Sequence, residues 1–139
     1  MKKHLSDIHI KIIPQSEHRV PYYIGDYWEE DNGSTLHIRA TDLKDWRMSM
    51  AIILHELNEY LLCRSMGVDE ERIFAFDQVF EAERKQGLHG EDDEPGDDPR
   101  APYRFEHEAS NIVENIYLHE MGITQKEYQD AIDAAFGGE

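Results

Sequence analysis

Residues 42–66 constrain the fold of this chain more than any other segment. Apolar side chains recur there with the period of an α-helix over more than twenty residues. Thr41 or Asp42 is suited to cap the start of this helix, and Gly67 is suited to end it in a left-handed conformation. We therefore expect a long helix that buries most of its surface.

Three ionisable residues interrupt the apolar run "IILHELNEYLL" at the centre of this helix, namely His55, Glu56 and Glu59. On a projection of about 100° per residue they lie away from a narrow polar stripe that we expect to face solvent. The polar stripe consists of Arg47, Asn58 and Ser65, and the expected apolar face of Ile53, Leu54, Leu57 and Leu61. Charged side chains rarely enter an apolar region without a partner. The pattern thus predicts a polar site inside the protein.

A divalent metal ion is one partner that such a site can have. His55 and Glu59 are one helical turn apart, so their side chains can converge on one point. Imidazole and carboxylate both bind zinc, and Glu56 is placed to reach a water molecule on the metal. The alternative is a buried hydrogen-bonded cluster without metal, tied to Arg39, Arg64 or a backbone group.

The sequence "HELNE" resembles the metal-binding motif of the zincin metallopeptidases, and the strand-like "TLHIRA" precedes it as an edge strand does in that family. The resemblance covers about residues 34–66. It implies a zinc-dependent peptidase, with His55 as the first ligand and Glu56 as the general base. Glu59 stands where the family has its second histidine.

A histidine from a later helix would restore a set of two histidines and one glutamate. His107, near the start of the third expected helix, is the leading candidate for this ligand. Glu114 shares its helix face, either as a further ligand or as a partner that orients one. Weaker candidates are Glu108, His119, and Asp77 with its neighbour Glu81, although the last two also fit a solvated helix face.

The remaining sequence predicts an α+β protein. Ile8, Ile10 and Ile12 alternate with polar residues as in a strand, and Asn32-Gly33 indicates a hairpin turn. We expect one small antiparallel sheet packed against the long helix. Three further helices should follow, at about residues 69–85, 104–121 and 124–138. We treat residues 1–139 as a single domain with a flexible acidic loop at 87–102.

The net charge of −16 opposes binding to nucleic acid or to anionic lipid. No segment has the length and apolar character of a membrane span. Cys63, the only cysteine, has no partner for an internal disulfide, so we expect a cytoplasmic protein.

Three hypotheses follow for the function. The first is a zinc-dependent hydrolase that acts on a peptide or protein substrate, with Glu56 as general base. The second is a metal-binding protein of the same fold without catalytic activity. The third is an acidic interaction protein, such as a small phage-type factor or inhibitor, in which the buried polar cluster is structural. A di-iron helical bundle is disfavoured because the first forty residues read as strands.

Overall fold

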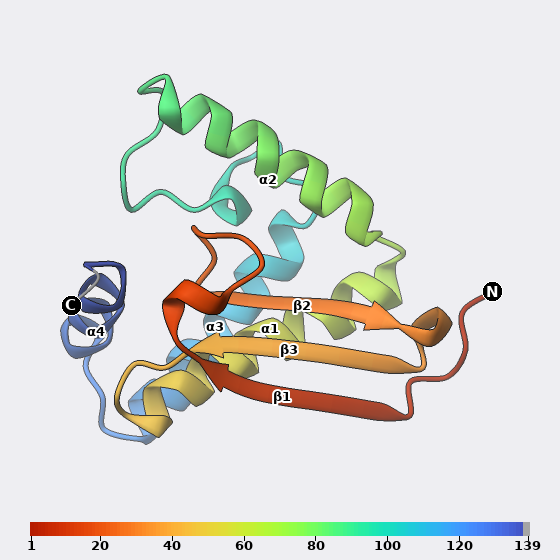
Figure 1. Ribbon diagram of the computed structural model, residues 1–139, viewed down its shortest axis with the longest axis horizontal. Helices are drawn as coiled ribbons and strands as arrows, with labels where there is room; N and C mark the ends of the chain where they lie inside the picture. The colour runs from red at the N-terminus through yellow and green to blue at the C-terminus, as the bar shows by residue number, and fades with distance from the viewer. Residues whose placement is uncertain (138–139) are drawn as a thin grey trace.

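The computed structural model describes residues 1–137 and confirms the α+β class, with one three-stranded sheet and four helices (Figure 1). The strands are β1 (Asp7–Ile13), β2 (Gly25–Glu30) and β3 (Thr35–Thr41), and the helices are α1 (Trp46–Met66), α2 (Glu70–Lys85), α3 (Arg104–Glu120) and α4 (Gln125–Phe136). Short 3-10 turns lie at Gln15–Glu17, Asp31–Gly33 and Pro95–Asp97. The last helix was expected to end at Gly137-Gly138; Gly137 is its C-cap, and Gly138 lies outside the described residues.

The sheet is mixed, so the prediction of an antiparallel sheet was wrong for one of its strands. β2 and β3 form the expected antiparallel hairpin, and Asn32 and Gly33 adopt positive φ angles in its turn. β1 pairs with the other side of β3 and runs parallel to it, which gives the strand order β1-β3-β2. Residues 14–24 carry the chain from the end of β1 to the far side of β3, and this crossing sets the parallel direction (Figure 1).

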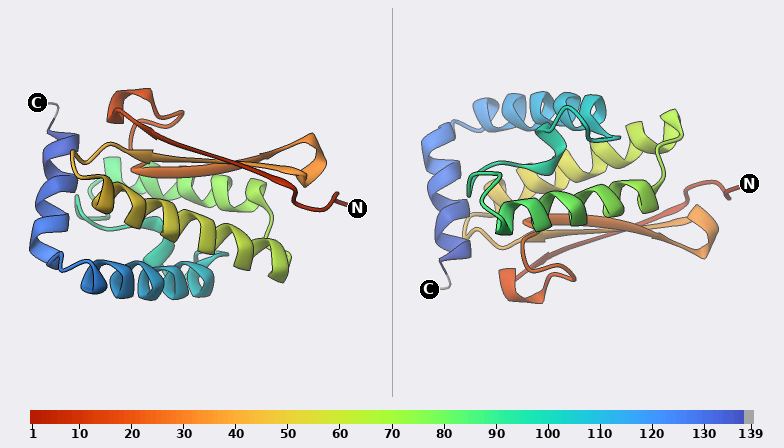
Figure 2. Two further views of the ribbon diagram at one scale, coloured as in Figure 1. Left: turned by 90° about the horizontal axis from the view of Figure 1, so that it is seen from below. Right: turned by 90° about the horizontal axis from the view of Figure 1, so that it is seen from above.

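Helix α1 is the middle layer of the molecule. Edge-on, the views in Figure 2 show the sheet on one side of α1 and α3 on the other, with α4 across the ends of these layers. Helix α2 lies beside the β2 edge of the sheet (Figure 1). A helix covered on two sides must bury residues around much of its circumference, which explains its nearly continuous apolar sequence.

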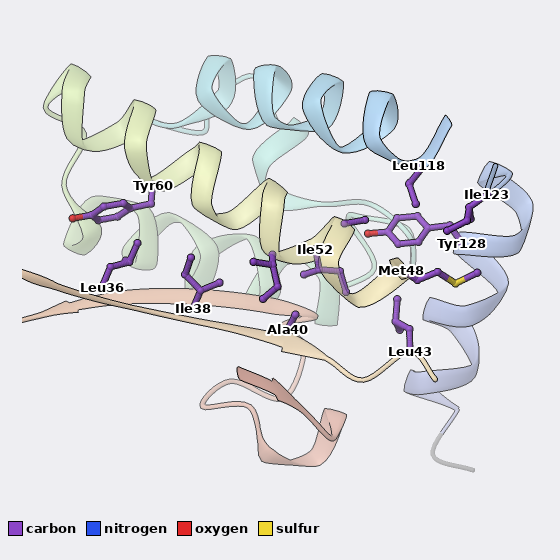
Figure 3. Packing of buried hydrophobic residues seen from close by; sticks show 12 residues of the cluster. Leu36, Ile38, Ala40, Leu43, Met48, Ile52, Tyr60, Leu118, Ile123 and Tyr128 are labelled. Carbon is purple, nitrogen blue, oxygen red and sulfur yellow. The ribbon is translucent and has the colours of Figure 1, made fainter. Parts of the chain in front are cut away.

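The hydrophobic core fills the space between β3 and α1. Leu36, Ile38 and Ala40 alternate along β3 and are fully buried against residues of α1 that include Ile52 and Tyr60 (Figure 3). The same cluster continues to the last two helices through Leu118, Ile123 and Tyr128. This packing holds α1 at a fixed position relative to both the sheet and α3.

Helix α1 begins later than predicted. Thr41 is the last residue of β3, and Lys44 takes a positive φ of 67° in the turn that follows. The N-cap is Asp45, whose side chain accepts a hydrogen bond from the amide of Arg47. Gly67 ends the helix in the left-handed conformation, as predicted.

The solvent side of α1 was placed correctly for Ser65, which is exposed, but not for Asn58. Asn58 donates a hydrogen bond to Ser110 Oγ of α3 at 3.1 Å and therefore faces a neighbouring helix. Leu61, assigned to the apolar face, is 45% exposed, and Leu57 is only partly buried. Sequence periodicity cannot show that a second helix covers the polar stripe.

The described residues include no helix long and apolar enough to cross a membrane.

Candidate metal centre

Three side chains from α1 and α3 converge on one point in the interior. His55 Nε2 lies 3.3 Å from Glu59 Oε2 and 3.2 Å from His107 Nδ1, and His107 Nδ1 lies 3.0 Å from the same Glu59 oxygen. All three residues are buried, between 5% and 7% exposed. The structure thus brings together the three residues that the sequence singled out as ligands.

Carboxylates hold the other nitrogen of each histidine. Glu114 Oε1 lies 2.8 Å from His55 Nδ1, and Tyr128 donates a hydrogen bond to the second oxygen of Glu114 at 2.5 Å. Glu94 Oε2 lies 3.0 Å from His107 Nε2, and Asp97 lies 3.4 Å from the same atom. A carboxylate on the outer nitrogen fixes a ring's orientation and leaves the inner nitrogen free to bind a metal.

Glu56 lies beside this group without belonging to it. Its Oε2 is 3.9 Å from His55 Nε2, farther than the contacts among the three converging side chains. Strand β2 passes very close to it, because a Cβ added to Gly25 would lie 2.8 Å from Glu56 Cγ and 2.6 Å from Ile52 Cγ2. Glycine at this position therefore lets β2 approach α1 and confines the Glu56 side chain.

Burial and hydrogen bonds act in opposite directions on the pKa values of the three residues, and carboxylates outside the group contribute as well. Burial lowers the pKa of His55, but hydrogen bonds with Glu114 and Glu59 outweigh it and raise the pKa to about 10. For His107, burial again lowers the pKa, and contacts with Asp97, Glu59 and Glu94 raise it to about 12. Burial raises the pKa of Glu59, but hydrogen bonds from both histidines bring it down to about 2.

The pKa of Glu56 shifts upward, in the opposite direction to that of Glu59. Burial, followed by the charge of Glu59, raises its pKa well above the usual value for a glutamate. A cation at the centre of the group would favour the ionised form of this carboxyl, since an opposite charge nearby lowers a carboxyl pKa.

The weaker ligand candidates lie in different places. Glu114 contacts His55 from the outer side, and Glu108 is exposed beside Asp97, Gly96 and Arg104. His119 is exposed near the end of α3. Of this set, only Glu114 touches one of the three converging side chains.

Asp77 and Glu81 are buried, so the expectation of a solvated helix face was wrong. Asp77 accepts hydrogen bonds from Tyr103 at 2.5 Å and Tyr23 at 2.7 Å, which form a separate cluster. Glu81 pairs with Arg84 at 2.8 Å. The hydrogen bonds of Asp77 hold helix α2 against the body of the protein, and the periodicity of the helix does not reveal them.

Sequence reasoning missed the contributions of Glu94, Asp97, Tyr27 and Tyr128. The acidic loop was read as solvated, yet it folds back so that Gly96 is buried against His107. A Cβ on Gly96 would lie 2.4 Å from the imidazole ring. The available signal was a glycine, Gly96, between Pro95 and Asp97 in this loop. Tyr27 on β2 donates a hydrogen bond to Glu59 at 3.3 Å.

Comparison with known proteins gives no match: no protein family, curated protein or solved structure corresponds to this chain.

Proposed function

We propose that the protein binds one divalent cation, zinc in the first instance, through His55, Glu59 and His107. The observation that carries the proposal is the triangle formed by His55 Nε2, His107 Nδ1 and Glu59 Oε2, with sides of 3.0–3.3 Å. Ligand atoms about 2.0–2.1 Å from a tetrahedral zinc ion are separated by roughly 3.3 Å. The three atoms thus have nearly the spacing that zinc requires.

The surroundings of the triangle support the same proposal. Two imidazoles and one carboxylate form a ligand set used by zinc hydrolases. Each imidazole has a carboxylate on its outer nitrogen, the arrangement that orients histidine ligands in metal sites. Three ionisable groups buried so closely together are stabilised when a cation compensates the carboxylate charge.

We further propose that the site hydrolyses peptide bonds in the manner of the zincins. A bound zinc ion supplies Lewis acidity, which polarises a carbonyl and acidifies water. Glu56, close to the ligands but outside their triangle, takes a proton from the attacking water and passes it to the leaving amine. The confined position of Glu56 beside Gly25 suits a group that must stay near the metal without binding it.

A non-catalytic metal site is the second candidate. The observation in its favour is the burial of all three ligands, since structural zinc sites are closed whereas catalytic sites keep a position open to substrate. The third candidate, an acidic interaction protein with a metal-free hydrogen-bonded cluster, is supported by the net charge of −16 and by contacts within hydrogen-bonding distance throughout the cluster.

We place the protein in the cytoplasm, a location that the lone, buried Cys63 supports.

Metal titration by calorimetry tests the binding proposal. Alanine at His55, Glu59 or His107 should weaken zinc binding by more than about tenfold, because water replaces a lost ligand poorly. Glu56→Gln is the matched control and should keep its affinity. Wild-type protein that binds no zinc, iron or manganese after purification and reloading would exclude both metal hypotheses and favour the interaction protein.

The pH dependence of binding gives an independent check. The raised pKa values of His55 (about 10) and His107 (about 12) mean that a cation must displace a proton from each ring at neutral pH. Affinity should therefore rise with pH, by about tenfold per pH unit for each proton released. Calorimetry in buffers of different ionisation enthalpy would count these protons. An affinity independent of pH between 6 and 9 would contradict the raised pKa values of the two histidines.

Hydrolysis is tested on the metal-loaded protein with a mixed peptide library. Wild type should cleave peptides, and Glu56→Gln should reduce the rate by at least about a hundredfold while metal remains bound. Metal binding without cleavage by either protein would identify the site as non-catalytic.

A further inference from the structure

Strand β1 is an open edge of the sheet. It pairs with β3 on one side, and within residues 1–137 no strand lies on its other side, as the strand order and Figure 1 show. The amide of Asp7 donates to Ser34 O, and Ile13 O accepts from the amide of Asp42, so the odd-numbered residues of β1 bond to the sheet. The alternation of backbone groups then directs the amides and carbonyls of Ile8, Ile10 and Ile12 toward the open edge.

The same three residues expose an apolar row. Ile8, Ile10 and Ile12 are 45%, 46% and 41% exposed. They are paired with Leu36, Ile38 and Ala40 of β3, so they lie on the helix-bearing face of the sheet. Between Asp7 and Ile13 the strand contains no proline and no charged residue on this face. Exposed edge strands usually carry prolines or charged residues, because these prevent association with another strand.

The charges around β1 differ from those of the rest of the chain. The first thirteen residues contain three lysines and one carboxylate, in a protein with 14 basic and 30 acidic residues. Asp7 and Lys11 both lie on the outer face of the strand, two residues to either side of His9, and both are exposed. An antiparallel copy of the strand centred on His9 would place each Asp7 opposite a Lys11 of the other copy.

The outer face supports the same register. His9 stacks on His37 with ring centroids 5.2 Å apart, and His37 stacks on Trp28 at 5.1 Å. This row crosses the sheet from β2 to β1. Pairing centred on His9 continues it into the second copy, while Ile8 of each copy faces Ile10 of the other.

We infer that two copies of this chain associate through antiparallel pairing of their β1 strands, with the two-fold axis at His9, to form a continuous six-stranded sheet. The interface is isologous, so each favourable contact occurs twice. Backbone hydrogen bonds and the isoleucine rows supply affinity, and the two Asp7–Lys11 pairs set the register. This inference does not depend on metal binding.

Sedimentation equilibrium in a metal chelator tests the inference. The wild type should form dimers at concentrations on the order of 100 µM. Lys11→Asp should weaken association by about tenfold or more, because carboxylates then face each other across both pairs. The double variant Asp7→Lys/Lys11→Asp should restore association to near the wild-type value, since it exchanges the charges while keeping them opposite.

Two further variants separate this edge from other surfaces. Ile10→Lys should abolish the dimer without unfolding the protein, because the side chain is already 46% exposed. Val79→Lys on α2, where the valine is 50% exposed, should leave the dimer intact. A monomeric wild type, a dimer that survives Ile10→Lys, or a double charge exchange that fails to restore association would each overturn the inference.

Discussion

The orientation of His55 depends on partners distant in sequence. Its outer nitrogen contacts Glu114 on α3, and Glu114 accepts a hydrogen bond from Tyr128 on α4. Helices α3 and α4 thus fix the ring of a residue on α1. If His55 binds a metal, the affinity of the site for that metal depends on the contacts with Glu114 and Tyr128 as well as on the imidazole.

We predict that Glu114→Gln weakens zinc binding by about 10–100-fold, the usual effect of altering a partner that orients a ligand. The amide keeps the size of the side chain but removes the charge that favours a donating Nδ1–H. Glu120→Gln, an exposed position on the same helix, is the control. Equal zinc affinities for the wild type and the Glu114 variant would show that this contact does not support a metal ligand.

Asp77 is a buried carboxylate outside the proposed metal site. Burial raises its pKa, and although hydrogen bonds from Tyr103 and Tyr23 lower it, the balance leaves the pKa at about 6, above its ordinary value of 3.8. The folded state therefore binds this proton more tightly than the unfolded state does. Its contribution to stability is fully present below about pH 3.8 and is lost as the pH rises through about 6.

We predict that Asp77→Asn stabilises the protein at pH 8 by up to about 3 kcal/mol, because the amide resembles the neutral carboxyl that the site prefers. The gain should shrink as the pH falls below 6. Urea unfolding at pH 8 and pH 5 measures it, with Glu71→Gln on the exposed side of α2 as control. A variant less stable than wild type at pH 8 would contradict the raised pKa.

At the scale of elements, β2 approaches α1 closely beside the site. Gly25 lies against Ile52 and Glu56, so the strand can reach the helix only where a side chain is absent. The hairpin and the long helix are each predicted by local sequence, but their separation depends on this one residue.

We predict that Gly25→Ala lowers the free energy of unfolding by about 1–3 kcal/mol, the usual cost of inserting a methyl group into packed surroundings. Gly137→Ala should change stability by less than about 0.5 kcal/mol, since Gly137 has an ordinary negative φ and no neighbour closer than 3.4 Å. Chemical denaturation of both variants tests the contrast. Equal effects would show that β2 can move away from α1 at little cost.

At the scale of the whole molecule, the net charge of −16 opposes compaction through repulsion among carboxylates. Much of this charge is exposed in the acidic loop and on the outer faces of the helices. Two exposed carboxylates of the loop, Glu94 and Asp97, also lie against His107. Repulsion among the exposed carboxylates should destabilise the folded protein, and added salt should reduce this repulsion.

We predict that the melting temperature rises as sodium chloride is increased from about 20 mM to about 500 mM, because the screening length falls below the spacing of surface charges. The increase should be smaller at about pH 5, where protonation of carboxylates reduces the net charge. Calorimetric scans across the salt series at both pH values measure it. A melting temperature that falls with salt at neutral pH would mean that surface ion pairs outweigh the repulsion.

The sequence alone determined the element types and much of the candidate site. Helix α1, its glycine end at Gly67 and the capping box at Thr124 follow from local periodicity and capping preferences, which neighbouring residues decide. His55 and Glu59 were recognisable together because a helical turn brings residues i and i+4 to one place. His107 was named from its position at the start of a helix and from its chemistry.

Only the tertiary structure decided which surfaces meet. Whether β1 runs parallel to β3, whether Asn58 faces solvent or α3, and whether Asp77 is buried all depend on contacts between segments far apart in the chain. The role of Glu94 depends on the path of an irregular loop that has no periodicity to read. Local sequence determines the conformation of each element, whereas the packing of apolar faces and the pairing of buried charges determine how the elements are arranged.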